Sequence, residues 1–113
     1  MRSIVERMQN MLLSEAVART LAETGEFRVE QVLPGKTSDT FSLCRAMQAD
    51  ILLMEVSRLP AYTLENRLNL IACVRKLMPS CKFVLLCDEN VDPELALRVM
   101  IVRQDRLIHA FLY

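Results

Sequence analysis

The sequence predicts an α/β domain built on a parallel sheet, and two apolar runs carry this prediction. Residues 51–54 read ILLM, residues 83–87 read FVLLC, and acidic residues follow each run at once. Short apolar runs bounded by charge suit strands that are buried on both faces of a parallel sheet. Helical patterns separate the expected strands, and this alternation predicts helices on both faces of the sheet.

Strands and helices are expected to alternate along the whole chain. Strands are predicted at residues 3–8, 27–34, 51–55, 82–87 and 109–113, and helices at 11–24, about 38–47, 63–78 and 93–104. Gly25 suits the left-handed end of the first helix, and Ser38 is placed to cap the second. Pro79 stops the third helix, and Asp92 can cap the fourth, with Pro93 in its first position. Five strands in this layout favour the flavodoxin-like order 2-1-3-4-5, with the strand at 27–34 at an edge.

Length and charge limit the function classes. The 113 residues suit one domain spanning 1–113, and 14 basic residues balance 14 acidic ones. This balance lacks the basic footprint of a nucleic-acid binder, so no direct nucleic-acid contact is expected. No apolar run approaches the roughly 18 residues of a membrane helix, and the amino terminus lacks a signal-peptide core. A cytoplasmic protein without membrane contact is therefore predicted.

The pattern of the four cysteines predicts a structural role in the core for each of them. Cys44, Cys73, Cys81 and Cys87 lie in apolar segments without CxxC spacing, which predicts reduced, buried thiols and neither disulfides nor zinc. No phosphate-binding glycine loop joins any strand to a helix. We therefore expect no metal, no cofactor and no enzymatic activity.

The stretch D50-I-L-L-M-E55, followed by Pro60, resembles the third strand of response-regulator receiver domains, the family typified by CheY. In that family an aspartate and four apolar residues precede the phosphoaccepting aspartate. The resemblance covers nearly the whole chain and implies a CheY-like fold for two-component signal transduction. It places Glu55 at the phosphoacceptor position. Glu55 is then either a standing mimic of the phosphorylated residue or a solvated residue at the strand end.

Other family positions are changed in this chain. The resemblance puts Met8 and Gln9 where an acidic pair normally holds Mg²⁺, and Cys87 where a serine or threonine binds the phosphoryl group. Phe111 keeps the type of the aromatic switch residue, whereas the family's lysine would fall just past Tyr113. Mg²⁺ needs hard oxygen ligands, and a thiol is a weak donor. These changes predict an atypical receiver, or pseudo-receiver, that works without phosphorylation in place of a phosphorelay.

The last helix and strand are the expected partner surface. The helix is apolar around much of its circumference, which is typical of a helix buried on more than one side. Receivers use this helix and the fifth strand for signalling and dimerisation, so the resemblance implies a homodimer. The surface residues expected there are Leu97, Val99, Met100, Ile101 and Phe111. The family's fifth helix is not accounted for by residues 1–113, which predicts the amino-terminal part of a longer regulator with a transcriptional output domain or another regulator as partner.

Two other functions fit parts of the sequence. A conventional phosphoaccepting receiver with a degenerate site would need Glu6, after a shift in register, to rebuild the metal site. A small flavodoxin-like thiol enzyme would use Cys87 as its nucleophile, with His109, the only histidine, as a conceivable partner.

Overall fold

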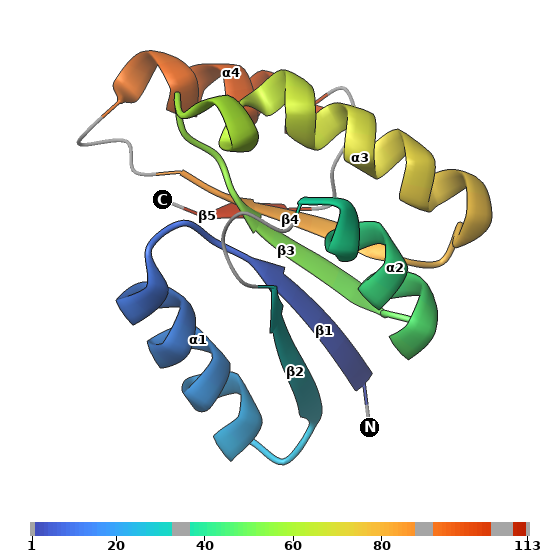
Figure 1. The fold of residues 1–113 in the computed structure, drawn as a ribbon. Coiled ribbons are helices and arrows are strands. Elements are labelled where there is room, and N and C mark those ends of the chain that lie inside the picture. The colour runs from blue at the N-terminus through green and yellow to red at the C-terminus, as the bar shows by residue number, and fades with distance from the viewer. Residues whose placement is uncertain (1, 33–36, 88–91, 105–109, 113) are drawn as a thin grey trace.

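Five parallel strands form a single sheet in the order β2-β1-β3-β4-β5, which confirms the predicted fold class (Figure 1). The computed structural model describes residues 2–32, 37–87, 92–104 and 110–112. The strands are β1 (Arg2–Arg7), β2 (Phe27–Val32), β3 (Ile51–Glu55), β4 (Lys82–Leu86) and β5 (Ala110–Leu112). Because all pairs are parallel, the carboxyl ends of the strands meet at one edge of the sheet.

The helices divide between the two faces of the sheet, as the alternating pattern predicted. They are α1 (Met11–Glu23), α2 (Thr37–Met47), α3 (Leu64–Leu77) and α4 (Pro93–Gln104), and a short 3-10 helix, η1 (Pro60–Tyr62), precedes α3. Figure 1 shows α2, α3 and α4 on one side of the sheet and α1 on the other, beside β1 and β2. None of the helices in the described ranges is long and apolar enough to cross a membrane.

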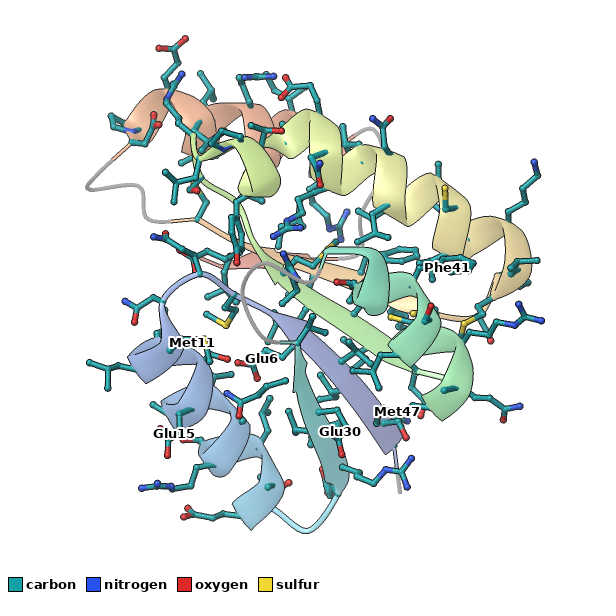
Figure 2. All side chains as sticks on the ribbon, in the orientation of Figure 1. Glu6, Met11, Glu15, Glu30, Phe41 and Met47 are labelled. Atoms are coloured by element: carbon teal, nitrogen blue, oxygen red, sulfur yellow. The ribbon has the colours of Figure 1, made fainter. Side chains whose placement is uncertain are left out.

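The main hydrophobic core lies between the central strands and the helices α2, α3 and α4. Leu52 and Met54 of β3 and Phe83 and Leu85 of β4 are fully buried and face this side. Alternation along each strand places these residues on one face, because successive side chains point to opposite faces. Phe41 of α2 packs against the same core, beside α3 (Figure 2). Residues 51–54 and 83–86 therefore lie in strands, as the sequence predicted, and Cys87 directly follows β4.

Helix ends largely follow the sequence signals. The Asp92 side chain accepts a hydrogen bond from Leu95 N at 3.0 Å and caps α4, as predicted. Gly25 takes a positive φ of 74° after α1, also as predicted. Ser38 was the predicted cap of α2, but this prediction is wrong because the backbone is already helical at Thr37.

Polar residues in β1 depart from the usual pattern of a central strand. Glu6 and Arg7 have no exposed surface, although β1 lies between β2 and β3. Strand β2 is the edge strand predicted, with Arg28 and Glu30 exposed. Burial of two charged side chains in a central strand is costly unless each finds partners.

Three of the four cysteines are packed in the interior. Cys44, Cys81 and Cys87 are buried and form no disulfide, which agrees with the predicted packing. Cys73 is exposed on α3, so the prediction is wrong for this residue. It follows Ile71 by two positions on the helix, and two residues turn a side chain to the opposite side of an α-helix.

Candidate functional site

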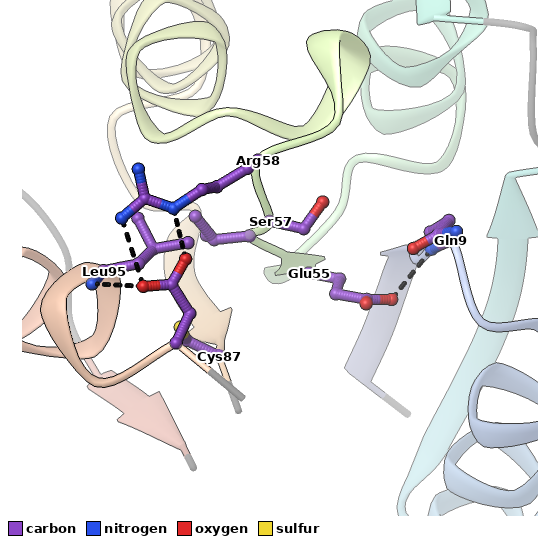
Figure 3. A pocket seen from close by; sticks show the side chains of 8 residues that line it. Gln9, Glu55, Ser57, Arg58, Cys87 and Leu95 are labelled. Atoms are coloured by element: carbon purple, nitrogen blue, oxygen red, sulfur yellow. Dashed lines mark hydrogen bonds and ion pairs between the residues drawn. The ribbon is translucent and has the colours of Figure 1, made fainter. Parts of the chain in front are cut away.

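A pocket of about 380 Å³ opens beyond the carboxyl ends of the central strands (Figure 3). Its position follows the general rule for open parallel sheets, whose ligands bind outside the strand ends. Glu55, at the end of β3, and Cys87, directly after β4, both line it. The full set of lining residues is Gln9, Glu55, Val56, Ser57, Arg58, Cys87, Asp92 and Leu95.

The Glu55 carboxylate is bound by backbone amides of the loop between β1 and α1. Its Oε1 accepts hydrogen bonds from Gln9 N at 2.9 Å and from Asn10 N at 3.1 Å. Figure 3 shows the Glu55 side chain reaching toward Gln9. Asn10 is also the cap of α1, so the carboxylate lies where the dipole at the start of that helix favours negative charge. Glu55 therefore joins the tip of β3 to the start of α1.

The two positions expected for an acidic pair carry no carboxylate. The Met8 side chain is completely buried, and Gln9 is exposed. Gln9 still contributes to the site, but through its backbone N–H. Within the described parts of the chain, no group of three histidine, cysteine or acidic residues is arranged to hold a metal ion.

Glu6, the alternative acid for a metal site, belongs to a network with α1. Its Oε1 accepts a hydrogen bond from Ser14 Oγ at 2.6 Å, and Gln31 Nε2 donates to the same hydroxyl at 2.8 Å. Figure 2 shows Glu6 between α1 and the sheet. Its neighbour in β3 is Leu53, two residues before Glu55, and burial raises the pKa of the Glu6 carboxyl. The structure thus places Glu6 in the support of α1.

An ion pair crosses the pocket from the loop after β3 to the start of α4. Arg58 binds both carboxylate oxygens of Asp92, with Nη2 to Oδ1 at 3.1 Å and Nε to Oδ2 (Figure 3). The hydrogen bond from Arg58 is the main cause of the lowered pKa of Asp92, and the bond from Leu95 N adds to it. Asp92 was predicted as a helix cap, but no sequence pattern indicated its partner Arg58, which lies 34 residues away.

Cys87 lies at the pocket, but only 4% of its surface is exposed. A thiol needs access and a lowered pKa to react as a nucleophile. His109, its suggested partner, lies outside the described residues, so the dyad stays a prediction.

The expected partner surface on α4 is only partly exposed. Leu97 and Ile101 are 54% and 47% exposed, and Met100 is half-buried. Val99 has no exposed surface, so its predicted place on this surface is wrong. It lies with Leu95 and Val102 on the buried face of the helix, at spacings of four and three residues. Phe111 pairs with Leu85 through the backbone in the sheet, and the structure does not describe the Phe111 side chain.

A second group of charged residues was missed by sequence reasoning. Arg7 and Arg67 are completely buried, and their guanidinium carbons lie 5.4 and 4.6 Å from the centre of the Tyr62 ring. Arg67 Nε also donates to the backbone oxygen of Glu55 at 3.1 Å. One signal was available, since Arg67 occupies the apolar stripe of α3 between Leu64 and Ile71, three and four residues away. A charged residue on a buried stripe often marks a function.

Comparisons with known proteins identify the fold. No family model matches the sequence, and no curated protein matches it. Solved structures do match. They include a DNA-binding response regulator of the LuxR family from Staphylococcus aureus, with a TM-score of 0.71 and 14% identity over 99% of this chain and 85% of that one. The chemotaxis protein CheY4 from Vibrio cholerae has a TM-score of 0.71 and 15% identity over the same shares of the two chains, 99% and 85%.

A third similar structure is a CheY-like protein, tadZ, from Pseudomonas aeruginosa. Its TM-score is 0.69, with 16% identity over 100% of this chain and 82% of that one. Identities this low establish architecture and leave activity open. The chain therefore has the fold of response-regulator receiver domains.

Proposed function

We propose that this chain is an atypical receiver module that acts as a binding domain, without enzymatic activity and without phosphorylation. The bonds from Gln9 N and Asn10 N to the Glu55 carboxylate carry this proposal. Both donors are neutral backbone N–H groups, and they engage the carboxylate at the position that the resemblance matches to the phosphoacceptor. The fold likeness to receivers and the side chains of Met8 and Gln9 support it.

The chemistry of phosphoryl transfer supports the same conclusion. Catalysis of this reaction depends on metal ions and cationic groups that neutralise the charge of the transferred group. Met8 and Gln9 supply no hard anionic oxygen, and Cys87 offers only a weak donor. Glutamate also carries its carboxylate one methylene farther from the backbone than aspartate does. In this proposal Glu55 makes a structural contact with the backbone and does not accept a phosphoryl group.

Incubation with acetyl phosphate and Mg²⁺ is expected to leave the intact mass of the protein unchanged. Glu55 is engaged by backbone amides, and the acidic pair is replaced. Mass spectrometry directly after acid quenching measures this, with a conventional receiver treated in parallel as a positive control. A stoichiometric gain of one phosphoryl group on Glu55 would contradict the proposal, whereas an unchanged mass for the Glu55→Asp variant would agree with it.

The proposed partner surface is a homodimer contact on α4, together with β5. Leu97 and Ile101 are large apolar side chains that are about half-exposed, and they lie four residues apart on one side of the helix. An exposed apolar pair costs less when a second copy covers it. The partner domain in this proposal is a transcriptional output domain or another regulator. The description of the S. aureus neighbour as a DNA-binding response regulator supports this by analogy of fold.

The variants Leu97→Asp and Ile101→Asp are each expected to convert a dimer into a monomer. A carboxylate placed in an apolar interface loses hydration without gaining a partner. Sedimentation velocity at matched protein concentrations measures the change. Leu12→Asp is the matched control, because Leu12 is 83% exposed on α1, on the other side of the sheet. An unchanged sedimentation coefficient in both α4 variants would reject this surface.

A further inference from the structure

Two buried guanidinium groups meet at one aromatic ring on the α2–α4 side of the sheet. Arg67 comes from the inner face of α3, and Arg7 comes from the end of β1, where it shares a strand face with the core residue Val5. Tyr62 comes from η1, which lies between β3 and α3 in the chain. The exposed fractions are 0% for both arginines and 5% for Tyr62.

Within the described residues, Arg67 and Tyr62 carry buried polar atoms that have no hydrogen-bond partner. Arg67 Nε donates to Glu55 O, but its Nη1 and Nη2 are buried and have no acceptor among the described residues. The Tyr62 hydroxyl is also buried and has no hydrogen-bond partner among those residues. The ring attracts the Arg67 guanidinium, but this contact does not replace the oxygen acceptors that the guanidinium N–H groups need. Native interiors rarely leave so many donors unsatisfied.

The two arginine charges also lie close enough to act on each other. Burial, and then the charge of Arg7, lower the pKa of Arg67 to about 10, so its guanidinium stays charged at neutral pH. The Glu55 carboxylate attracts Arg67, but its hydrogen bonds go to Gln9 N and Asn10 N. A buried water molecule would supply acceptors without supplying negative charge. An anion supplies hydrogen-bond acceptors and negative charge together.

We propose that Arg67 and Tyr62, beside the charge of Arg7, bind a small oxyanion of the phosphate type, non-covalently, under the connection between β3 and α3. The terminal nitrogens of arginine form a planar fork that matches two oxygens of such an anion, and the tyrosine hydroxyl can donate to a third. This site is separate from the Glu55 carboxylate, and the inference goes beyond the receiver role proposed above. A free oxyanion here requires no transfer chemistry.

Occupancy of this site would be transmitted to the end of β3. Arg67 holds the Glu55 backbone oxygen through Nε, while the Glu55 carboxylate holds the amides of Gln9 and Asn10. A ligand that fixes the Arg67 guanidinium therefore fixes the strand end and the start of α1 together. The module would sense a dissolved anion in place of a covalent phosphoryl group.

Titration of the whole chain with inorganic phosphate, at constant pH and ionic strength, tests the proposal. The expected result is a saturable rise in melting temperature and saturable shifts of the Gln9, Asn10 and Glu55 amide signals with one dissociation constant. Chloride replaces phosphate in the reference series. The same rise with chloride, or no saturation with phosphate, would overturn an oxyanion site.

Variants assign the effect to Arg67. Arg67→Met should abolish the phosphate-dependent rise, and Arg67→Lys should weaken binding about tenfold, because lysine keeps the charge and loses the fork. Arg19→Met is the control, since Arg19 is exposed on α1 and distant in sequence from the site. If Arg67→Met fails to fold, Arg67→Lys and Tyr62→Phe still decide the matter. Both should bind phosphate more weakly than the wild type, and unchanged affinity in both would refute the site.

Discussion

Replacing Tyr62 with alanine is expected to lower the free energy of unfolding by about 3–5 kcal/mol, the usual cost of removing a buried aromatic ring. The ring is 5% exposed and contacts both buried guanidinium groups. Its loss leaves a cavity and removes the cation–π contacts to Arg7 and Arg67. The cost is a large share of the roughly 5–15 kcal/mol that stabilises an ordinary domain.

Urea unfolding followed by circular dichroism measures this loss, and Tyr62→Phe is the matched variant. Phenylalanine keeps the ring and removes only the hydroxyl, which is buried without a hydrogen-bond partner in the described structure. In phosphate-free buffer, Tyr62→Phe should therefore be as stable as the wild type, or more stable. A loss of under about 1 kcal/mol in Tyr62→Ala would show that the ring does not hold the two arginines.

Val99→Asp is expected to leave the chain largely unfolded at room temperature. Val99 has no exposed surface and belongs to the core cluster that includes Phe83 and Val74. A carboxylate at this place would be buried without a partner, a change that costs about 4–5 kcal/mol or more. The result would be loss of structure, and not the clean monomer expected from a surface change.

Ile101→Asp provides the contrast, because Ile101 is two residues away on the same helix and 47% exposed. It should keep the native circular dichroism spectrum and a melting temperature close to that of the wild type at low protein concentration. The pair separates folding from association on a single helix. A folded, cooperative Val99→Asp protein would show that α4 packs on the sheet by another face.

Much of the fold could be predicted because the local signals agree with one another. The runs at 51–54 and 83–87 needed two buried faces, and a parallel sheet with helices on both sides supplies them. Asp92 and Gly25 marked helix ends with chemistry that few other positions satisfy. Val99 was misplaced because α4 is apolar around much of its circumference, so its spacing alone did not select the buried face.

The candidate site was predictable only where side chains carry the signal. Glu55 and Cys87 were placed correctly at the strand ends. The partners of Glu55 are backbone amides, which every residue except proline possesses, so no sequence pattern announces them. The pairing of Arg58 with Asp92 joins distant segments, and only the fold brings them together. Arg67 was the exception, since its place on an apolar stripe was visible in the sequence.

The two hydrogen bonds from backbone N–H groups to the Glu55 carboxylate bear on how a cell would control the proposed module. A residue that accepts a phosphoryl group lets a kinase and a phosphatase change the state of a protein repeatedly. A carboxylate that is hydrogen-bonded to the backbone and is not phosphorylated cannot be controlled in this way. Association would then follow mass action, so that the number of molecules sets the fraction of dimers. Rates of synthesis and degradation would then set the fraction of dimers, in addition to any effect of an anion bound at Arg67.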